Sequence, residues 1–380
     1  MEFSRRKVLV AGGAAAVVTL AGGWRALTTP ALAEAAGPWR RAGKGFADPR
    51  LDALSYAILA PNPHNRQPWR FTLVGGDTID VACDLARRLP ATDPFDRQIV
   101  IGFGCMLELL RIAAAERGYT ATITPFPDGE DQPRLAGGRI ARVRFVKGAA
   151  VRDPLFGAVL ARRSTKEPFL ERPVADAEVA ALASALPAGV ALGHSTPANH
   201  AALSANAIGA WETEQATPAT RRESIALMRI GNAAVVAQPD GIDLGSPFMT
   251  GAGALGIVTP TSLDTPGSMA FQSGIDMYRS LVAATPRWVW LTTPGNTRAD
   301  QLVAGAAWVR LNLAANARGL AVHPWSQALQ EFPEMQERYR ELRGLAGAGE
   351  RGLQMFARLG FGPAVDPSPR WPLETKLVDV

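Results

Sequence analysis

Two almost entirely apolar helical segments recur in this chain at a constant offset of 201 residues. Residues 104–118 read GCMLELLRIAAAERG, and residues 305–319 read GAAWVRLNLAANARG. Each segment places apolar side chains at i, i+3, i+4 and i+7 with almost no polar face, which predicts a helix buried on all sides. Their glycines and alanines permit close helix–helix approach, and each ends at an Arg-Gly pair typical of a helix C-terminus. The repeat therefore predicts two pseudo-symmetric halves around a shared core.

Shorter helical and strand-like stretches flank these segments in mixed order, which predicts the α+β class. Asp93 followed by Pro94 reads as a helix N-cap with proline at the first helical position. The expected helices span residues 51–59, 95–117, 175–185, 201–214, 299–318 and 334–343, and the expected strands span 71–74, 78–82, 141–146, 288–292 and 353–360.

The N-terminus has the layout of an export signal. Ser4-Arg5-Arg6-Lys7 precedes a short apolar stretch interrupted by glycines, and residues 31–33 read Ala-Leu-Ala, a cleavage-site pattern. The paired arginines and the modest hydrophobicity favour the twin-arginine translocase. We expect residues 1–33 to be a cleaved signal peptide that delivers the protein to the periplasm or another extracytoplasmic space. An uncleaved membrane anchor is the alternative.

Composition argues against several classes of function. Residues 1–33 hold four basic side chains and one acidic one, so the formal net charge falls from +5 to +2 without them. No basic stripe with interleaved aromatics indicates a nucleic-acid partner. No Cys/His cluster has metal-ligand spacing, so no metal is expected. Cys83 and Cys105 lie in a strand-like and a helical segment, and we expect buried free thiols rather than a disulfide.

The loop before the first expected strand carries the most specific motif. Residues 61–71 read PNPHNRQPWRF, with three prolines and the side-chain amides of Asn62, Asn65 and Gln67. An amide offers a donor and an acceptor in one plane, which suits the edge of a heteroaromatic ring. We call residues 61–69 the amide loop. A rigid surface turn whose amides cap the backbone is the alternative.

A basic string opens the second half. Residues 162–166 read Arg-Arg-Ser-Thr-Lys and follow a short helical stretch. An arginine fork gives a phosphate two parallel charge-assisted hydrogen bonds, and the hydroxyl of Ser164 could add another. A solvated basic turn is the alternative.

Together, the amide loop and the basic string resemble two signatures of the nitroreductase family, A-P-S-x-x-N-x-Q-P-W-x-F and R-R-S-x-R/K-x-F. The resemblance implies FMN-dependent oxidoreductases in which two subunits hold each flavin between them. It spans roughly residues 40–375, and it implies two such subunits fused as an intramolecular pseudo-dimer, as in the Acg-type branch. The halves are then expected over residues 34–150 and 151–380, and a monomer becomes plausible.

The resemblance also assigns residues to the cofactor. Asn62 stands where the family usually has Ser, and Lys166 would reach the ribityl chain or the ring edge where negative charge gathers on reduction. Core packing is an equal alternative for Trp325, and a plain surface position for Arg370. The expected FMN contacts are Asn62, Asn65, Gln67, Trp69, Arg162, Arg163, Ser164, Lys166, Trp325, Gln327 and Arg370.

The two signatures are complementary across the repeat. The amide loop occurs only in the first half, and no N-x-Q-P-W motif appears around residues 190–200, where the second copy should fall. The Arg-Arg-Ser string is intact only in the second half, because no Ser follows Arg40-Arg41. Dimeric members of the family take phosphate ligands from one subunit and the amide loop from the other. We therefore predict one complete site and one FMN per chain.

The implied activity is two-electron transfer as hydride through flavin N5 to a nitroaromatic, quinone or similar acceptor, which needs no protein nucleophile. Family members take electrons from NAD(P)H, which is scarce outside the cytoplasm, so another donor stays open. FMN storage or sequestration without turnover is the alternative, and a structural protein with a decayed site is a third. Residues 238–268 are long for a loop, and we expect a lid over the flavin that bears Phe248 and Met249.

Overall fold

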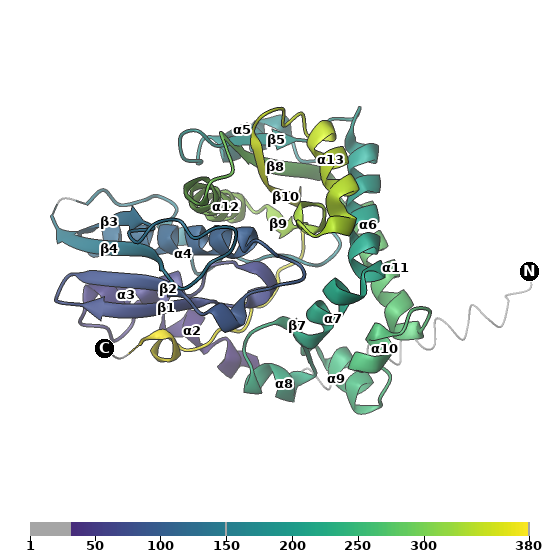
Figure 1. Ribbon diagram of the computed structural model, residues 1–380, viewed down its shortest axis with the longest axis horizontal. Helices are drawn as coiled ribbons and strands as arrows, with labels where there is room; N and C mark the ends of the chain where they lie inside the picture. The colour runs from purple at the N-terminus through teal and green to yellow at the C-terminus, as the bar shows by residue number, and fades with distance from the viewer. Residues whose placement is uncertain (1–31, 149, 379–380) are drawn as a thin grey trace, which may run out of the picture.

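Two four-stranded antiparallel sheets form the frame of the protein in a computed structural model that describes residues 32–148 and 150–378 (Figure 1). The first sheet has the strand order β1-β2-β4-β3, and the second has the order β5-β8-β10-β9. The strands are β1 (Trp69–Val74), β2 (Thr78–Cys83), β3 (Tyr119–Pro125), β4 (Arg139–Lys147), β5 (Ala191–His194), β8 (Arg287–Thr293), β9 (Ala321–Pro324) and β10 (Gly352–Gly360).

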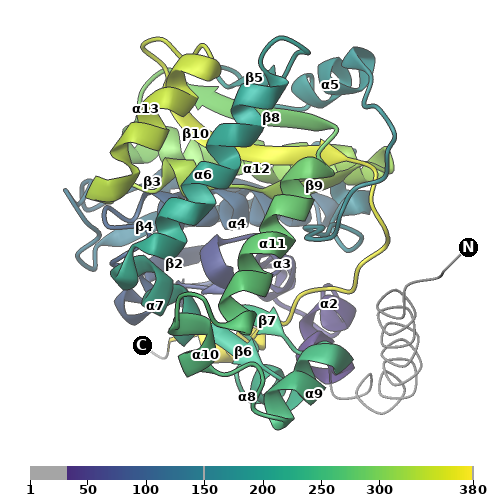
Figure 2. The same ribbon diagram turned by 90° about the vertical axis from the view of Figure 1, so that its right-hand side faces the viewer.

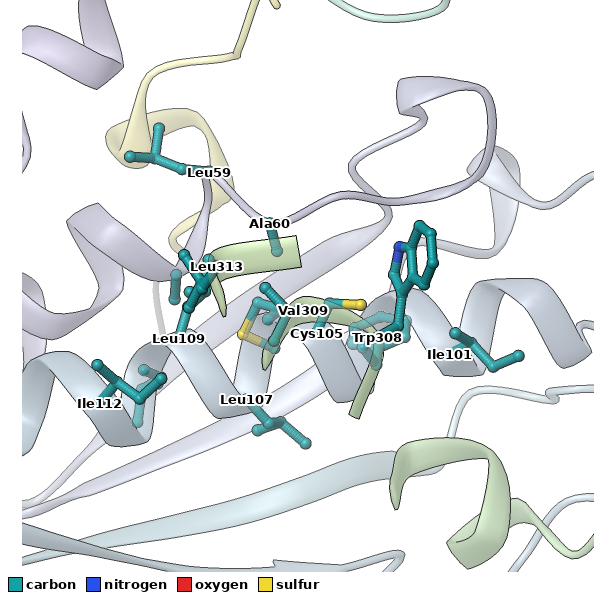
Figure 3. Close-up of a cluster of buried hydrophobic side chains, with 14 of the residues drawn as sticks. Leu59, Ala60, Ile101, Cys105, Leu107, Leu109, Ile112, Trp308, Val309 and Leu313 are labelled. Carbon is teal, nitrogen blue, oxygen red and sulfur yellow. The ribbon is translucent and has the colours of Figure 1, made fainter. Parts of the chain in front are cut away.

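Two long helices, α4 (Arg97–Glu116) and α12 (Arg298–Ala317), pack on each other where the halves meet. A Cβ atom on Gly104 would lie 2.1 Å from the carbonyl oxygen of Leu302, and one on Gly305 would lie 2.0 Å from that of Ile101. The helix backbones therefore touch at these two glycines, and apolar side chains of both helices interleave around the crossing (Figure 3). Among the described helices, α4 alone is long and apolar enough to cross a membrane, yet it is a buried core helix.

The two halves follow one order of elements, which confirms the predicted pseudo-symmetry. The series β1-β2-α4-β3-β4 corresponds to β5-β8-α12-β9-β10, and helices α3 (Pro49–Ala57) and α5 (Asp176–Ala183) precede the first strand of each series. The counterpart of the amide loop is therefore the α5–β5 connection at residues 184–190. It was expected at residues 190–200, and that placement was wrong because the connection is shorter than its first-half counterpart. Its sequence, SALPAGV, has no side-chain amide.

A helical insertion distinguishes the second half. A tight turn joins β1 to β2, whereas residues 195–286 join β5 to β8. We call residues 200–283 the arm; it leaves the second sheet along α6, reaches the first half and returns along α11 (Figures 1 and 2). Its elements are α6 (His200–Ala216), α7 (Pro218–Ala226), β6 (Met228–Ile230), α8 (Asn232–Ala237), β7 (Ile242–Leu244), α9 (Pro247–Ala254), α10 (Pro260–Asp264) and α11 (Met269–Ala283).

The segment read from composition as one long loop, residues 238–268, is structured within the arm. It contains β7, α9 and α10. The side chain of Ser246 caps α9, and that of Thr259 caps α10, while proline occupies the first turn of both helices. The same Ser, Thr and Pro residues that suggested a loop therefore start short helices. Phe248, the expected lid residue, is 59% exposed.

The chain returns to the first half after β10. Leu377 forms a bridge with Phe71 of β1, and the backbone N–H of Val378 donates to the carbonyl of Phe71 at 2.8 Å. This C-terminal tail, residues 361–378, thereby passes beside the amide loop. Helix α2 (Gly37–Arg41) packs nearby against α3, and α13 (Gln336–Leu345) packs against α6.

The expected helices and strands are confirmed to within two residues at each end. One predicted boundary was wrong: α4 begins at Arg97 and not beside Asp93, because Asp96 has φ +58° and interrupts the helix. Asp93 still accepts hydrogen bonds from the N–H groups of Gln98 and Ile99, at 3.0 and 2.9 Å. Both cysteines are free and buried, as expected. The predicted signal peptide lies outside the described residues apart from positions 32 and 33.

Candidate functional site

The amide loop has an unusual backbone that its own side chains stabilise. His64, Asn65 and Gln67 all have positive φ, at 46°, 51° and 49°. Such conformations are uncommon for residues with a Cβ and concentrate at functional sites. Asn62 braces the loop, because its Oδ1 accepts from the N–H of Gln67 at 2.7 Å and its Nδ2 donates to the carbonyl of Ala60 at 3.0 Å. In this structure Asn62 therefore serves the shape of the loop.

The other two amides of the loop bind distant parts of the chain. Asn65 Nδ2 donates to the carbonyl of Pro369 at 3.0 Å, and its Oδ1 accepts from Arg370 Nη1 at 2.7 Å. Gln67 is fully buried; its Nε2 donates to the carbonyl of Pro239 at 2.8 Å, and its Oε1 accepts from the N–H of Trp371 at 2.9 Å. The amide loop is thus held between the arm and the C-terminal tail.

The two tryptophans that were predicted to contact FMN lie in hydrophobic cores. Trp69 is buried and meets Phe103 edge-on, with 6.4 Å between ring centroids. Trp325 is buried in the second core cluster, beside Trp288, and its indole N–H donates to the carbonyl of Ala207 at 2.9 Å. Gln327, just after β9, is half-buried. Packing accounts for Trp325, which is the alternative that the sequence left open for that residue, whereas the indole N–H of Trp69 is buried without a hydrogen-bond partner among the described residues.

Three arginines from two distant parts of the sequence, the adjacent pair Arg162-Arg163 and Arg370, converge on one aromatic ring. The guanidinium carbons of Arg162, Arg163 and Arg370 lie 5.5, 4.9 and 5.6 Å from the ring centre of Trp39 in α2. The Trp39 indole N–H donates to the carbonyl of Ser368 at 2.9 Å, which fixes the ring on the C-terminal tail. We call these four residues the arginine cluster. Asn65 joins it through its bond to Arg370.

The arginine cluster has unused hydrogen-bond donors. Arg162 is 2% exposed and Arg370 is 3% exposed. Within the described part of the chain, Nε and Nη1 of Arg162 and Nε of Arg370 have no hydrogen-bond partner. Burial lowers the pKa of Arg162 to about 10, with a smaller contribution from neighbouring Arg163. Burial, and then the two neighbouring arginines, also lower the pKa of Arg370. Asp366 already acts on the charge of Arg163. A phosphate would supply acceptors for the unpartnered donors of Arg162 and Arg370, so the cluster fits that group.

Lys166 lies between the amide loop and β9. Its charge, after the effect of burial, contributes to the lowered pKa of both His64 and His323, and the pKa of His64 falls to about 4. Burial of the ammonium lowers the pKa of Lys166, and the charge of Asp243 in β7 opposes that shift, although the residue as a whole is exposed. The N–H of Thr165 donates to the carbonyl of Val322 at 3.0 Å, which fixes the basic string on β9.

Most of the predicted site residues therefore surround one region. The arginine cluster contains the predicted residues Arg162, Arg163 and Arg370, and Asn65 is bonded to Arg370. Half-buried Ser164 follows Arg163 in the sequence. Gln67 accepts from the N–H of Trp371, the residue after Arg370. Sequence reasoning missed Trp39, because nothing in its spacing links it to three distant arginines. It also missed Asp240, which contacts Trp371 from the arm.

No protein-family model matches the chain. Among curated proteins, it is 36% identical over 122 residues to acg of Mycobacterium tuberculosis H37Rv, provisionally named an NAD(P)H nitroreductase; the match covers 32% of this chain and 36% of that protein. It is 34% identical over 121 residues to Rv3127 of the same organism, covering 31% and 35% of the two chains. The matched region thus spans about a third of the length of these relatives.

Among solved structures, the FMN-dependent nitroreductase NfnB from Mycobacterium smegmatis, in complex with NADPH, aligns with a TM-score of 0.37 and 18% identity. That alignment covers 57% of this chain and 94% of NfnB. The resemblance to the Acg-type branch of the nitroreductase family, first read from the amide loop and the basic string, is confirmed over the 122 residues that match acg.

Proposed function

We propose that the protein is an FMN-dependent oxidoreductase of the nitroreductase type, which passes two electrons to a nitroaromatic, quinone or similar acceptor. One observation carries the proposal: buried, unpartnered guanidinium donors of Arg162 and Arg370 lie beside the amide loop. A buried cation without a counter-charge is unfavourable, so the cluster is best explained by an anionic ligand. The nitroreductase name of the relative acg supports a flavin phosphate as that ligand.

Each part of the site would have a separate task. Arg162, Arg163 and Arg370 would bind the phosphate of FMN, with the Ser164 hydroxyl as a further donor. Lys166 would lie toward the ring edge on which negative charge develops, where a cation raises the reduction potential. FMN itself supplies the hydride chemistry when it is bound. Because their pKa values are lowered, His64 and His323 are neutral at pH 7 and are poor proton donors.

We also propose export by the twin-arginine translocase, on the basis of residues 1–33. An exported protein would fold, and bind its flavin, before it crosses the membrane. NAD(P)H is the donor suggested by the names of acg and of the NADPH complex of NfnB. The scarcity of these donors outside the cytoplasm favours a different donor there.

FMN storage is the second candidate, and a specific contact favours it. The arm is bonded directly to the amide loop, through Gln67 to the carbonyl of Pro239 and through the N–H of Gly241 to the carbonyl of Asn65 at 3.3 Å. A segment held on this loop would restrict access to a flavin ring bound there. Slow or absent exchange of electrons with soluble donors would then follow.

Anaerobic stopped-flow absorbance of the FMN-loaded mature protein separates these functions. If the protein is an enzyme, mixing with NADH or NADPH bleaches the visible flavin band, and a nitroaromatic or quinone restores it. Bleaching by dithionite alone would favour storage or an unidentified donor. A protein that takes up no FMN would refute both functions.

A further inference from the structure

The arm contacts the amide loop through one short turn. Pro239, Asp240 and Gly241 lie between α8 and β7, and Gly241 has φ +75°. The backbone on either side of Asp240 bonds two of the three amide residues of the loop, because the carbonyl of Pro239 accepts from the Gln67 side chain and the N–H of Gly241 donates to the backbone carbonyl of Asn65. The second half of the chain thereby reaches the two residues that are expected to face the flavin ring.

The Asp240 side chain joins three further segments. Asp240 is 7% exposed. Its carboxylate accepts hydrogen bonds from Arg87 Nη1 at 2.6 Å, Arg229 Nη2 at 2.6 Å and Trp371 Nε1 at 3.1 Å. Arg87 follows β2 in the first half, Arg229 lies in β6 of the arm, and Trp371 lies in the C-terminal tail. Burial raises the pKa of Asp240, but the bonds from Trp371, Arg229 and Arg87 outweigh it and leave the pKa below its usual value.

Trp371 transmits this contact to the cofactor residues. Its indole N–H binds Asp240, while its backbone N–H donates to Oε1 of Gln67 at 2.9 Å. The preceding residue is Arg370, which bonds Asn65 and belongs to the arginine cluster. The Asp240 carboxylate therefore fixes Trp371, and Trp371 in turn orients the Gln67 amide and is the residue next to Arg370.

We propose that Asp240 is a positioning residue of the cofactor site, through which the arm holds the Gln67 amide and Arg370 in their binding orientations. The inference rests on the proposed FMN function and deepens it, because it makes the arm a required part of the flavin site. The printed partners of the Asp240 carboxylate are Arg87, Arg229 and Trp371, none of them among the residues predicted to contact FMN, so Asp240 acts through Trp371. An amide at this position would keep one acceptor oxygen but turn the other into an NH2 donor that faces N–H groups of Arg87, Arg229 or Trp371, so the hold of Asp240 on the tail beside Gln67 would weaken.

The test compares Asp240→Asn with Asp264→Asn. Asp264 lies on the same arm and accepts from Arg221 Nε at 2.8 Å and Arg222 Nε at 2.9 Å, so it has similar chemistry without contacting the amide loop or the tail. FMN affinity is measured by quenching of flavin fluorescence, the bound flavin by its visible spectrum, and folding by thermal unfolding of the FMN-free proteins.

For Asp240→Asn we expect FMN to bind about tenfold more weakly, which corresponds to about 1.4 kcal/mol, and the visible band of bound FMN to shift. Asp264→Asn should leave affinity and spectrum unchanged. Trp371→Phe keeps an aromatic side chain at this position and removes the indole donor, so it should reproduce the spectral shift with a smaller loss of affinity even if Asp240→Asn folds poorly.

Three results would overturn the inference, and the measurements distinguish them. In the first, the wild type binds FMN while Asp240→Asn and Trp371→Phe both keep its FMN affinity and its visible spectrum. That result would overturn the positioning role of Asp240 and leave the proposed function standing. A wild-type protein that binds no FMN would overturn the proposed function as well. Equal losses of affinity in Asp240→Asn and Asp264→Asn, in proportion to lost stability, would reduce Asp240 to a general structural role and also overturn the inference.

Discussion

Replacing Arg162 with Met should weaken FMN binding and yet stabilise the FMN-free protein. In the structure, two of the three guanidinium nitrogens of Arg162, Nε and Nη1, are buried without a partner, and its single bond, from Nη2 to the carbonyl of Leu59, is 3.3 Å long. Each unsatisfied buried donor costs about 1–3 kcal/mol, and the long bond contributes about 1 kcal/mol at most. An unbranched apolar side chain of similar length removes both costs.

The net gain for the FMN-free protein is then about 1–5 kcal/mol. A chain of 380 residues has an unfolding entropy of about 0.8 kcal/mol/K, from about 2 cal/mol/K per residue. The Tm of the FMN-free Arg162→Met protein should therefore rise by about 1–6 °C. FMN binding loses a bidentate charge-assisted contact worth about 3 kcal/mol, so the Kd should rise about 100-fold.

Thermal unfolding by circular dichroism, with and without FMN, measures both effects. Arg97→Met is the matched control, because Arg97 is equally buried but donates to the carbonyls of Gln354 at 2.9 Å and Leu329 at 2.7 Å. We expect that variant to lose about 3 kcal/mol and to keep its FMN affinity. A lower Tm for FMN-free Arg162→Met, together with unchanged FMN affinity, would refute the assignment of the arginine cluster to an anion.

Three further predictions concern the core, pH and the arm. Gly305→Ala should destabilise the protein by about 3 kcal/mol, because its Cβ would meet the carbonyl oxygen of Ile101; Gly274→Ala, at an open position in α11, should be neutral or slightly stabilising in the same urea titration. Burial raises the pKa of Glu214 to about 7, so its contribution to stability is full below about pH 4.5 and is lost as pH rises through 7. Glu214→Gln should therefore flatten the fall in stability between about pH 5 and 8, and an unchanged slope would contradict this. FMN should slow limited proteolysis within residues 241–267, and equal cutting with and without FMN would remove the lid hypothesis.

The sequence was sufficient to predict the framework of the fold. The offset repeat identified α4 and α12, since a helix with no polar face can only be buried, and the glycines at 104 and 305 lie at the crossing. Strand-like stretches in the sequence located the main strands. Asp93 showed the limit of local reasoning, because the left-handed Asp96 between it and the helix moves the start of α4 to Arg97.

Residues of the candidate site could be predicted from the sequence only where they belong to a local motif. The amide loop and the basic string carry local patterns, and the structure brings Asn65 and Arg162 to one arginine cluster. Trp39 and Asp240 carry no such pattern, because their partners are hundreds of residues away or lie on another element. The enclosure of Gln67 by Pro239 and Trp371 likewise depends on how the arm and the tail fold back, which no local spacing encodes.

The most direct test of this account is the stoichiometry of FMN on the purified mature protein, measured by equilibrium titration of flavin fluorescence with wild type and Arg162→Met in parallel. The account predicts one equivalent of FMN per wild-type chain and much weaker binding by the variant. No binding by the wild type, or two equivalents per chain, would contradict a single composite site built from the amide loop of one half and the arginines of the other.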